Sequence, residues 1–181
     1  MPTPTAFWDK ASKKYAASPI KDMDSYKHTL ARTKSYLNKA DHALELGCGT
    51  GSTALLLAPH LRKITATDIS GKMIEIAKEK AWNASVMTVE FSQADVINSR
   101  PKDPVDAVFA FNLLHLVEDL SGALNHINEV LPKDGLFISK TACLADGGWY
   151  FRPMIWLMQF FGMAPFVGYF GISDLERQIE D

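Results

Sequence analysis

The sequence predicts an α/β protein whose doubly wound, mostly parallel sheet carries helices on both faces. Two observations predict this fold class. Short apolar runs alternate with longer stretches of helical periodicity, and a glycine-rich turn directly follows the first run. Runs that are apolar on both sides are typical of parallel strands, which are joined by helical crossovers. The length of 181 residues suits a single domain.

The individual elements follow from the same pattern. We expect strands at 42–46, 64–68, 88–92, 107–111 and 136–141. We expect the helices between them at 52–61, 71–82 and 120–131. Ahead of the first strand, apolar residues recur at helical spacing in a polar segment, and a second helix there is predicted from about 22 to 37.

The composition excludes several classes of function. The net charge of −2 implies no strongly basic face, so nucleic acid is not expected as a partner. The two cysteines, Cys48 and Cys143, form no CxxC pair and the histidines show no ligand spacing, so we expect neither a disulfide nor a metal site. The N-terminus has no apolar signal segment, and we therefore expect a cytoplasmic protein.

The most informative segment is the turn after the first strand, Glu45-Leu46-Gly47-Cys48-Gly49-Thr50-Gly51. Glycines at alternate positions permit a tight turn and let the backbone approach a ligand closely. Asp68 ends the second strand about 20 residues later, where nucleotide-binding βαβ units place the acid that binds ribose hydroxyls. The spacing of the turn and of Asp68 therefore predicts a nucleoside-containing ligand.

Three interpretations of this turn compete. A dinucleotide-binding turn has the spacing G-x-G-x-x-G, whereas here the third glycine, Gly51, comes one position early. In addition, the Glu45 carboxylate suits the cationic amino group of a methionine moiety better than a pyrophosphate. A nicotinamide-dependent oxidoreductase is therefore disfavoured, and a non-catalytic adenosyl-ligand binding protein stays open. A turn without any ligand is disfavoured because the loop and Asp68 agree in spacing.

Several segments of the chain resemble the motifs of class I S-adenosylmethionine-dependent methyltransferases, and of the small-molecule, ubiquinone-biosynthesis-like group among them. They are Glu45–Gly51 for motif I, Ala66–Met73 for motif II, Gln93–Val96 for the adenine-binding turn, Asp106–His115 for the fourth strand with its exit loop, and Leu131–Ile138 for the turn into the fifth strand. The resemblance covers about residues 41–141. Its motifs are specific for the cofactor and leave the acceptor undefined.

The resemblance implies a Rossmann-like fold and transfer of a methyl group from S-adenosylmethionine to a small, partly apolar acceptor by in-line displacement, leaving S-adenosylhomocysteine. It divides one expected domain, residues 1–181, into N-terminal helices at 1–40, a cofactor-binding core at 41–145 and an aromatic cap at 146–181. Residues 172–181 look like the helix that precedes the family's final antiparallel hairpin. The hairpin itself is missing from the sequence, so we expect the strand at 136–141 to be an open edge.

The resemblance also implies cofactor-binding residues near the carboxyl ends of the strands. They are Glu45, Gly47, Cys48 and Gly49 for the methionine end, Asp68 for the ribose, Ile69, Met73, Asp95 and Val96 for the adenine, and Asn112 for the sulfonium, with Tyr15, Gly51 and Leu113 completing the set. Asp95 has an alternative role as an ordinary helix N-cap. His115, which follows the fourth strand, is the candidate general base, and an ordinary packing role is its alternative.

A segment rich in aromatic residues follows the fifth strand. Its aromatic residues are Trp149, Tyr150, Phe151, Trp156, Phe160, Phe161, Phe166, Tyr169 and Phe170. Charged residues and prolines interrupt it, so we do not expect it to span a membrane, although contact with a membrane surface stays open. We expect a mobile helical lid over the acceptor pocket, with Gly147, Gly148, Gly162 and Gly168 as hinges, and ordinary core packing is the alternative.

Overall fold

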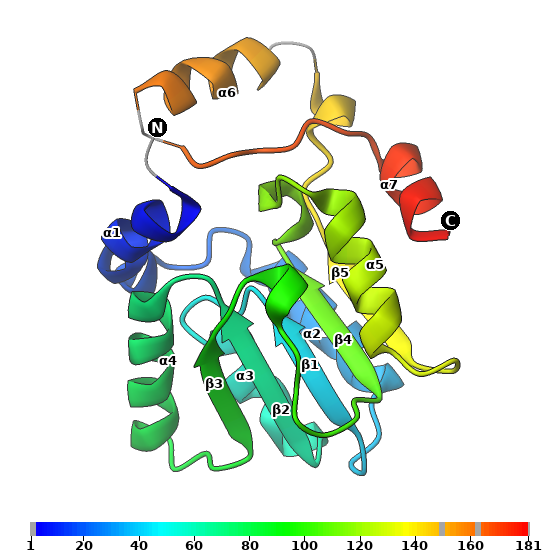
Figure 1. Ribbon diagram of the computed structural model, residues 1–181. Helices are drawn as coiled ribbons and strands as arrows, with labels where there is room; N and C mark the ends of the chain where they lie inside the picture. The colour runs from blue at the N-terminus through cyan, green and yellow to red at the C-terminus, as the bar shows by residue number, and fades with distance from the viewer. Residues whose placement is uncertain (1–2, 149–150, 162–163, 181) are drawn as a thin grey trace.

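The computed structural model describes residues 3–148, 151–161 and 164–180. Five parallel strands form one sheet in the order β3-β2-β1-β4-β5, with helices on both faces (Figure 1). The strands are β1 (His42–Leu46), β2 (Lys63–Asp68), β3 (Val89–Gln93), β4 (Ala107–Phe111) and β5 (Leu136–Lys140). The helices are α1 (Pro4–Ala17), α2 (Met23–Tyr36), α3 (Ser52–Leu57), α4 (Gly71–Asn83), α5 (Leu120–Val130), α6 (Phe151–Phe160) and α7 (Ile172–Glu180). Short 3₁₀ turns are η1 (Ala58–His60), η2 (Val96–Asn98), η3 (Leu114–Leu116) and η4 (Leu144–Gly147).

The predicted fold class is confirmed, and the expected strands are all present. β1 and β4 pair in the interior of the sheet, from Ala43 opposite Ala107 to Leu46 opposite Ala110. One expected helix is shorter than predicted, because α3 stops at Leu57 and continues only as the 3₁₀ turn η1. Pro59 lies in that turn and has no N–H to donate to the preceding helical turn.

Alternate residues of β1 face the two sides of the sheet, and each side has its own apolar core. Ala43 belongs to a cluster with residues of α3 and α4, against which Leu30 of α2 also packs. Leu44 and Leu46 belong to a second cluster with Ala123 and Ile127 of α5. Every residue of β1 is buried, as expected of a central parallel strand covered on both faces.

β5 lies at the edge of the sheet and is less protected than β1. Its five residues are all half-buried, and it pairs with β4 alone among the described residues. No sixth strand is present in the part of the chain that the structure describes, so β5 is an open edge there. The terminal segment expected to be helical is α7.

The aromatic side chains Trp156 and Phe160 of α6 lie outside the core, whereas Phe170 of the same aromatic segment packs against a buried cluster that includes Leu114 and Leu175. Trp156 is 65% exposed and Phe160 is 68% exposed, and their rings stack with centroids 5.9 Å apart. The helix stands beyond the carboxyl ends of the strands, at the same end of the sheet as α1 (Figure 1). Of the residues named for the aromatic lid and its hinges, Trp149, Tyr150 and Gly162 lie outside the described residues.

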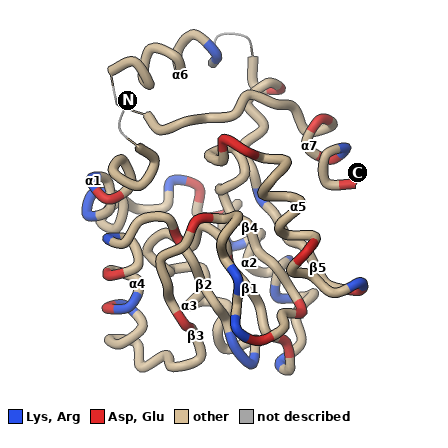
Figure 2. The backbone as a smooth tube through the Cα atoms, in the orientation of Figure 1, with Lys and Arg blue, Asp and Glu red and all other residues tan. Residues whose placement is uncertain are grey.

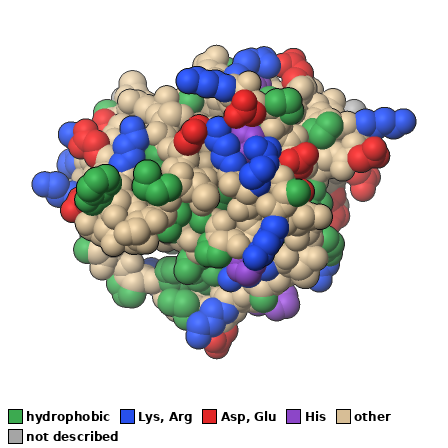
Figure 3. Space-filling model, turned by 90° about the horizontal axis from the view of Figure 1, so that it is seen from below, with side chains coloured by type: hydrophobic (Ala, Val, Ile, Leu, Met, Phe, Trp, Pro, Cys, Tyr) green, Lys and Arg blue, Asp and Glu red, His purple; other side chains and the backbone are tan. Residues whose placement is uncertain are grey.

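The surface at the opposite end of the sheet carries charges of both signs. Figure 3 shows Lys and Arg side chains interspersed there with Asp and Glu. Lys63 at the start of β2 pairs with Glu90 and with Asp103, each at 3.0 Å. No helix in the described residues combines the length and the apolar character needed to cross a membrane.

Candidate functional site

A cavity of about 290 Å³ opens at the carboxyl ends of the strands, beneath α1. The sequence-predicted cofactor residues that line it are Tyr15, Gly47, Gly49, Asp68, Ile69, Met73, Asp95, Val96, Asn112 and Leu113. Further lining residues are Pro4, Trp8, Ala94, Ile97, Phe111, Leu116, Val117, Glu118 and Asp119. The cavity therefore lies where open α/β sheets bind their ligands.

Two glycines of the turn after β1 have different structural roles. Gly49 (φ +54°) lines the cavity, and a Cβ built there would approach only a ring carbon of Tyr15, at 3.7 Å. The space beside Gly49 is therefore open to a ligand. Gly51 (φ +75°) lies away from the cavity, and its Cβ would come within 2.8 Å of Phe91 and 2.9 Å of Ala77. Gly51 thus allows close packing against β3 and α4, and its expected ligand role needs correction.

Cys48 also differs from its expected role, because neither its side chain nor its backbone N–H faces the cavity. Its N–H donates to the carbonyl oxygen of Thr67 at 2.8 Å and continues the pairing of β1 with β2. The thiol is buried, and burial raises its pKa well above the usual value. The hydrogen bonding between β1 and β2 thus extends past Leu46, the last residue of β1, and uses the N–H of Cys48. Cys48 therefore has a structural role in the turn.

Asp68 joins the end of β2 to the glycine turn. One carboxylate oxygen (Oδ2) accepts the N–H of Gly49 at 2.8 Å, and the other (Oδ1) accepts the N–H of Ser70 at 2.9 Å. Burial raises the pKa of Asp68, while these two hydrogen bonds oppose the rise. The carboxylate lines the cavity in a fixed orientation and leaves lone pairs for ligand hydroxyls.

Glu45 lies behind the cavity wall and is only 2% exposed. Its Oε2 atom is one of the buried side-chain atoms without a hydrogen-bond partner in the described part of the chain. Burial, and secondly the negative charge of Asp68, raise the pKa of Glu45 to about 8. Such a carboxyl group is costly to leave unpaired, and a cationic ligand near Asp68 would stabilise its ionised form. The residues present therefore fit a cationic nucleoside ligand.

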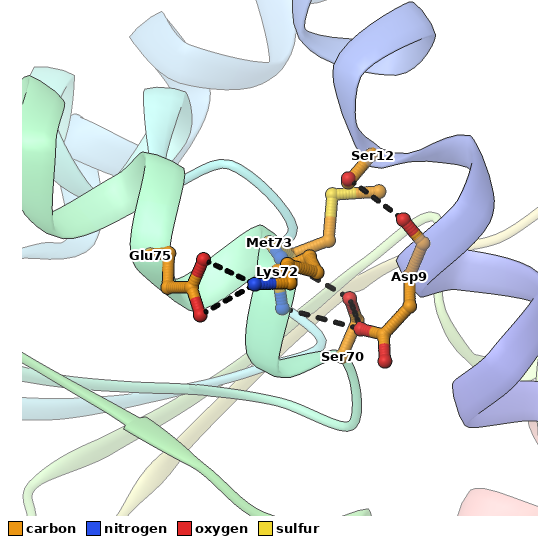
Figure 4. A network of polar contacts seen from close by, with 6 residues as sticks. All are labelled: Asp9, Ser12, Ser70, Lys72, Met73 and Glu75. Atoms are coloured by element: carbon orange, nitrogen blue, oxygen red, sulfur yellow. Dashed lines mark hydrogen bonds and ion pairs between the residues drawn. The ribbon is translucent and has the colours of Figure 1, made fainter.

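A polar clasp holds α1 over the cavity (Figure 4). Asp9 of α1 accepts the hydroxyl of Ser70 at 2.6 Å and the backbone N–H of Lys72 at 3.2 Å, at the N-terminus of α4. These bonds, that of Ser70 first, lower the pKa of Asp9, and the helix dipole of α4 favours the same negative charge. Because Ser70 also donates its N–H to Asp68, the clasp connects α1 to the ribose-binding candidate.

Removing the clasp should weaken ligand binding without touching the cavity lining. We expect Asp9→Ala to lower S-adenosylmethionine affinity about threefold to tenfold, because Trp8 and Tyr15 on α1 then lose their fixed position. Titration calorimetry measures the affinity, and hydrogen exchange should be faster in α1 of the variant. Asp24→Ala, at an exposed position in α2, is the matched control. Unchanged affinity in Asp9→Ala would contradict this role.

A comparison with protein families decides the family of this chain. The family model described as "Methyltransferase domain" matches residues 44–139, which run from β1 through the glycine turn and Asp68 to β5. The chain belongs to this methyltransferase domain family. The earlier resemblance to S-adenosylmethionine-dependent methyltransferases is thereby confirmed at the level of the family.

Individual relatives of this methyltransferase domain agree with the family match. "Uncharacterized methyltransferase YcgJ" of Bacillus subtilis (strain 168) is 29% identical over 102 residues, which are 55% of this chain and 40% of that protein. "Trans-aconitate 2-methyltransferase" of Enterobacter sp. (strain 638) is 36% identical over 102 residues, 55% of this chain and 38% of that protein. The solved structure "DhpI-SAM-HEP complex" has the same fold, with a TM-score of 0.69 at 21% identity over 97% of this chain and 85% of that one. The chain spans about two fifths of the length of these curated relatives.

The candidate general base after β4 of the methyltransferase domain does not lie where it was expected. His115 lines neither this cavity nor a second one near α6, so the structure does not bring its ring to the ligand candidates. Its Nδ1 atom is buried and has no hydrogen-bond partner within the described part of the chain, and burial lowers the pKa of the ring. Further along the same loop, Asp119 caps α5 by accepting the N–H of Gly122 at 2.9 Å, and it also lines the cavity.

Asp95, on the expected adenine side, and Trp8 of α1 also line the domain's cavity. Asp95 occupies the N-cap position of η2, but its side chain makes no capping hydrogen bond there, and Asp95 lines the cavity. Trp8 was missed as a lining residue. Trp8 and Tyr15 are seven residues apart and so lie on the same face of α1, and this spacing could have predicted that Trp8 lines the cavity as Tyr15 does. Their two rings contact edge to face, with centroids 6.1 Å apart.

Proposed function

We propose that this chain binds S-adenosylmethionine in the cavity beneath α1 and transfers its methyl group to a small acceptor, leaving S-adenosylhomocysteine. One observation carries the proposal. Two acidic residues lie at an open glycine turn: Asp68 accepts the N–H of Gly49, and nearby Glu45 is buried with an oxygen that has no partner among the described residues. Membership of the methyltransferase domain family supports it. A structural neighbour named as a complex with SAM supports it further.

Each part of the cavity has a role in this proposal. Asp68 would accept the ribose hydroxyls, Ile69 and Met73 would contact the adenine, and Asp95 would accept its amino group. Glu45, ionised in the complex, would balance the positive charge of the methionine end. When bound, the sulfonium supplies an activated methyl group, so the protein mainly has to hold the acceptor in line and exclude water. A general base at His115 is not required for this.

A nicotinamide-dependent oxidoreductase fits the cavity less well. A pyrophosphate at the glycine turn would lie near two carboxyl groups, those of Glu45 and Asp68. The N–H groups of Cys48 and Gly49, which would bind phosphate oxygens, already donate to Thr67 and Asp68. A non-catalytic adenosyl-binding protein would share the cavity, and detection of any methylated product separates it from an enzyme.

Replacement of Asp68 tests the proposed ligand. We expect Asp68→Ala to weaken S-adenosylmethionine binding about tenfold to a hundredfold, because ribose hydroxyls lose a buried acceptor. Calorimetric titration with S-adenosylmethionine and with NAD measures both affinities. Asp134→Ala, at an exposed position before β5, is the matched control. Thermal unfolding checks that the variant stays folded. Wild-type affinity in folded Asp68→Ala, or tighter binding of NAD, would overturn the assignment.

A further inference from the structure

A second cavity lies next to the proposed cofactor cavity and has a different lining. Its volume is about 320 Å³, and its lining residues are Pro4, Phe7, Glu118, Gln159, Ala164, Pro165 and Phe166. They come from the start of α1, the loop after β4, and the segment that contains α6. This is the part of the aromatic segment that faces a cavity, whereas the stacked rings of Trp156 and Phe160 are exposed.

The two cavities share part of their walls. Pro4 and Glu118 line both of them, so a molecule in the second cavity would lie beside a ligand in the first. Phe7, Pro165 and Phe166 give the second cavity a mainly apolar surface. An apolar body can be buried there next to the methyl donor, and water is excluded by the same contacts.

The two polar side chains of the second cavity, Glu118 and Gln159, both offer acceptor oxygens. Glu118 contributes a carboxylate. Gln159 donates one Nε2 hydrogen to the carbonyl oxygen of Pro165 at 2.9 Å, which orients the amide and leaves Oε1 as an acceptor and the second Nε2 hydrogen as a donor. An occupant that donates hydrogen bonds can pair with both groups. A carboxylate or phosphate would meet the like charge of Glu118, and among these side chains only the second Nε2 hydrogen of Gln159 could bind it.

The negative charge of the two cavities together also favours an occupant that is not an anion. The acidic residues that line the two cavities are Asp68, Asp95, Glu118 and Asp119, and no Lys, Arg or His lines either among the described residues. Buried Glu45 adds a further carboxyl group behind the wall. Figure 2 shows the acidic segment where α5 begins, on the side of the molecule where α6 lies. An anionic acceptor would enter this site without a cationic partner.

We propose that the second cavity is the acceptor site and that it selects an apolar amine over an apolar carboxylate. This inference rests on the proposed function, because it places the acceptor beside S-adenosylmethionine. Glu118 would bind the acceptor's ammonium group at the cavity mouth, where the side chain is exposed, and the ammonium would lose its proton to bulk water. The nitrogen lone pair then forms the N–C bond to the methyl group while the C–S bond breaks. That electron pair stays on sulfur, which becomes a neutral thioether.

Binding to the protein saturated with S-adenosylhomocysteine tests the inference without turnover. The probes are 2-phenylethylamine, phenylacetate and 2-phenylethanol, which present a similar body with a cationic, an anionic and a neutral head. We expect the amine to bind at least about tenfold more tightly than the carboxylate, with the alcohol between them. Glu118→Gln should weaken amine binding about fivefold and improve carboxylate binding. Glu79→Gln, at an exposed position on α4, removes the same charge elsewhere and should change neither.

The outcomes separate the two proposals. Failure of S-adenosylhomocysteine itself to bind would overturn the proposed function, and this inference with it. If S-adenosylhomocysteine binds but phenylacetate matches or exceeds the amine, the charge selection is wrong while the cofactor site stands. If none of the probes binds the loaded protein, the second cavity is not an acceptor site. Mass spectrometry of the amine after incubation with S-adenosylmethionine should show addition of one methyl group, and addition to phenylacetate instead would contradict the inference.

Discussion

Replacing Glu45 by glutamine should raise the free energy of unfolding by about 4–5 kcal/mol at pH 8.5, and by less than about 1 kcal/mol at pH 5. The pKa of Glu45 is raised from 4.5 to about 8 in the folded protein, mainly by burial. The folded state therefore retains a proton that the unfolded chain releases. Wild-type stability is highest below the unfolded pKa, falls as the pH rises towards the folded pKa, and stays level above it. Glutamine has no charge to bury and escapes this loss.

The same substitution should weaken S-adenosylmethionine binding by at least about tenfold above pH 8, because the anionic partner of the methionine end is gone. Urea unfolding at several pH values and calorimetric titration measure the two effects. Glu79→Gln, at an exposed position on α4, should leave the pH dependence of stability as in the wild type. Equal stability of wild type and Glu45→Gln at pH 8.5 would show that Glu45 is paired or hydrated in solution.

Valine at position 49 should abolish measurable cofactor binding, a loss of at least about a hundredfold. The Cβ of residue 49 would project into the cavity opposite Tyr15, where the proposed ligand lies, and the valine methyl groups would extend further. The positive φ of +54° adds backbone strain of roughly 1 kcal/mol for any residue with a Cβ. Gly49→Ala should be intermediate, since it brings the strain and only one carbon.

A substitution at Gly51 separates strain in the turn from loss of ligand space. Gly51→Ala should lower thermal stability more than Gly49→Ala does, because its Cβ meets Phe91 and Ala77 rather than open space. It should affect affinity less than Gly49→Val does. Calorimetry and thermal unfolding of both variants measure this difference. Wild-type cofactor affinity in folded Gly49→Val would show that the cofactor does not bind in this cavity.

The fold was predictable because its signals are local and repeated. Apolar runs such as 107–111 are too short for buried helices, and the intervening segments carry helical periodicity, so alternation alone indicated parallel strands. Helix ends were less predictable. α3 ends early at Leu57 because Pro59 interrupts it, a local effect that the periodicity of 52–61 did not weigh.

The cavity lining was predictable only where a motif fixed it. Asp68 and Gly49 line the cavity because both follow strands whose carboxyl ends meet at one edge. Trp8 lines it because Asp9 fastens α1 to the start of α4, a contact across 61 residues of sequence that no local pattern reveals. Cys48 was expected to bind the ligand because of its position in the motif. The motif gives no information on whether its backbone N–H is already hydrogen-bonded within the sheet, as it is to Thr67.

Asp68 has a further consequence for selectivity. Its two oxygens are held by Gly49 and Ser70 before any ligand arrives, so complex formation costs little side-chain rotational entropy at this position. A carboxylate fixed in this way is preorganised for one placement of a diol. It cannot turn to meet a ligand whose hydroxyls lie elsewhere without breaking a bond to the glycine turn. The turn and the acid therefore form one rigid recognition unit, and discrimination between ligands arises from its shape before any lid has closed.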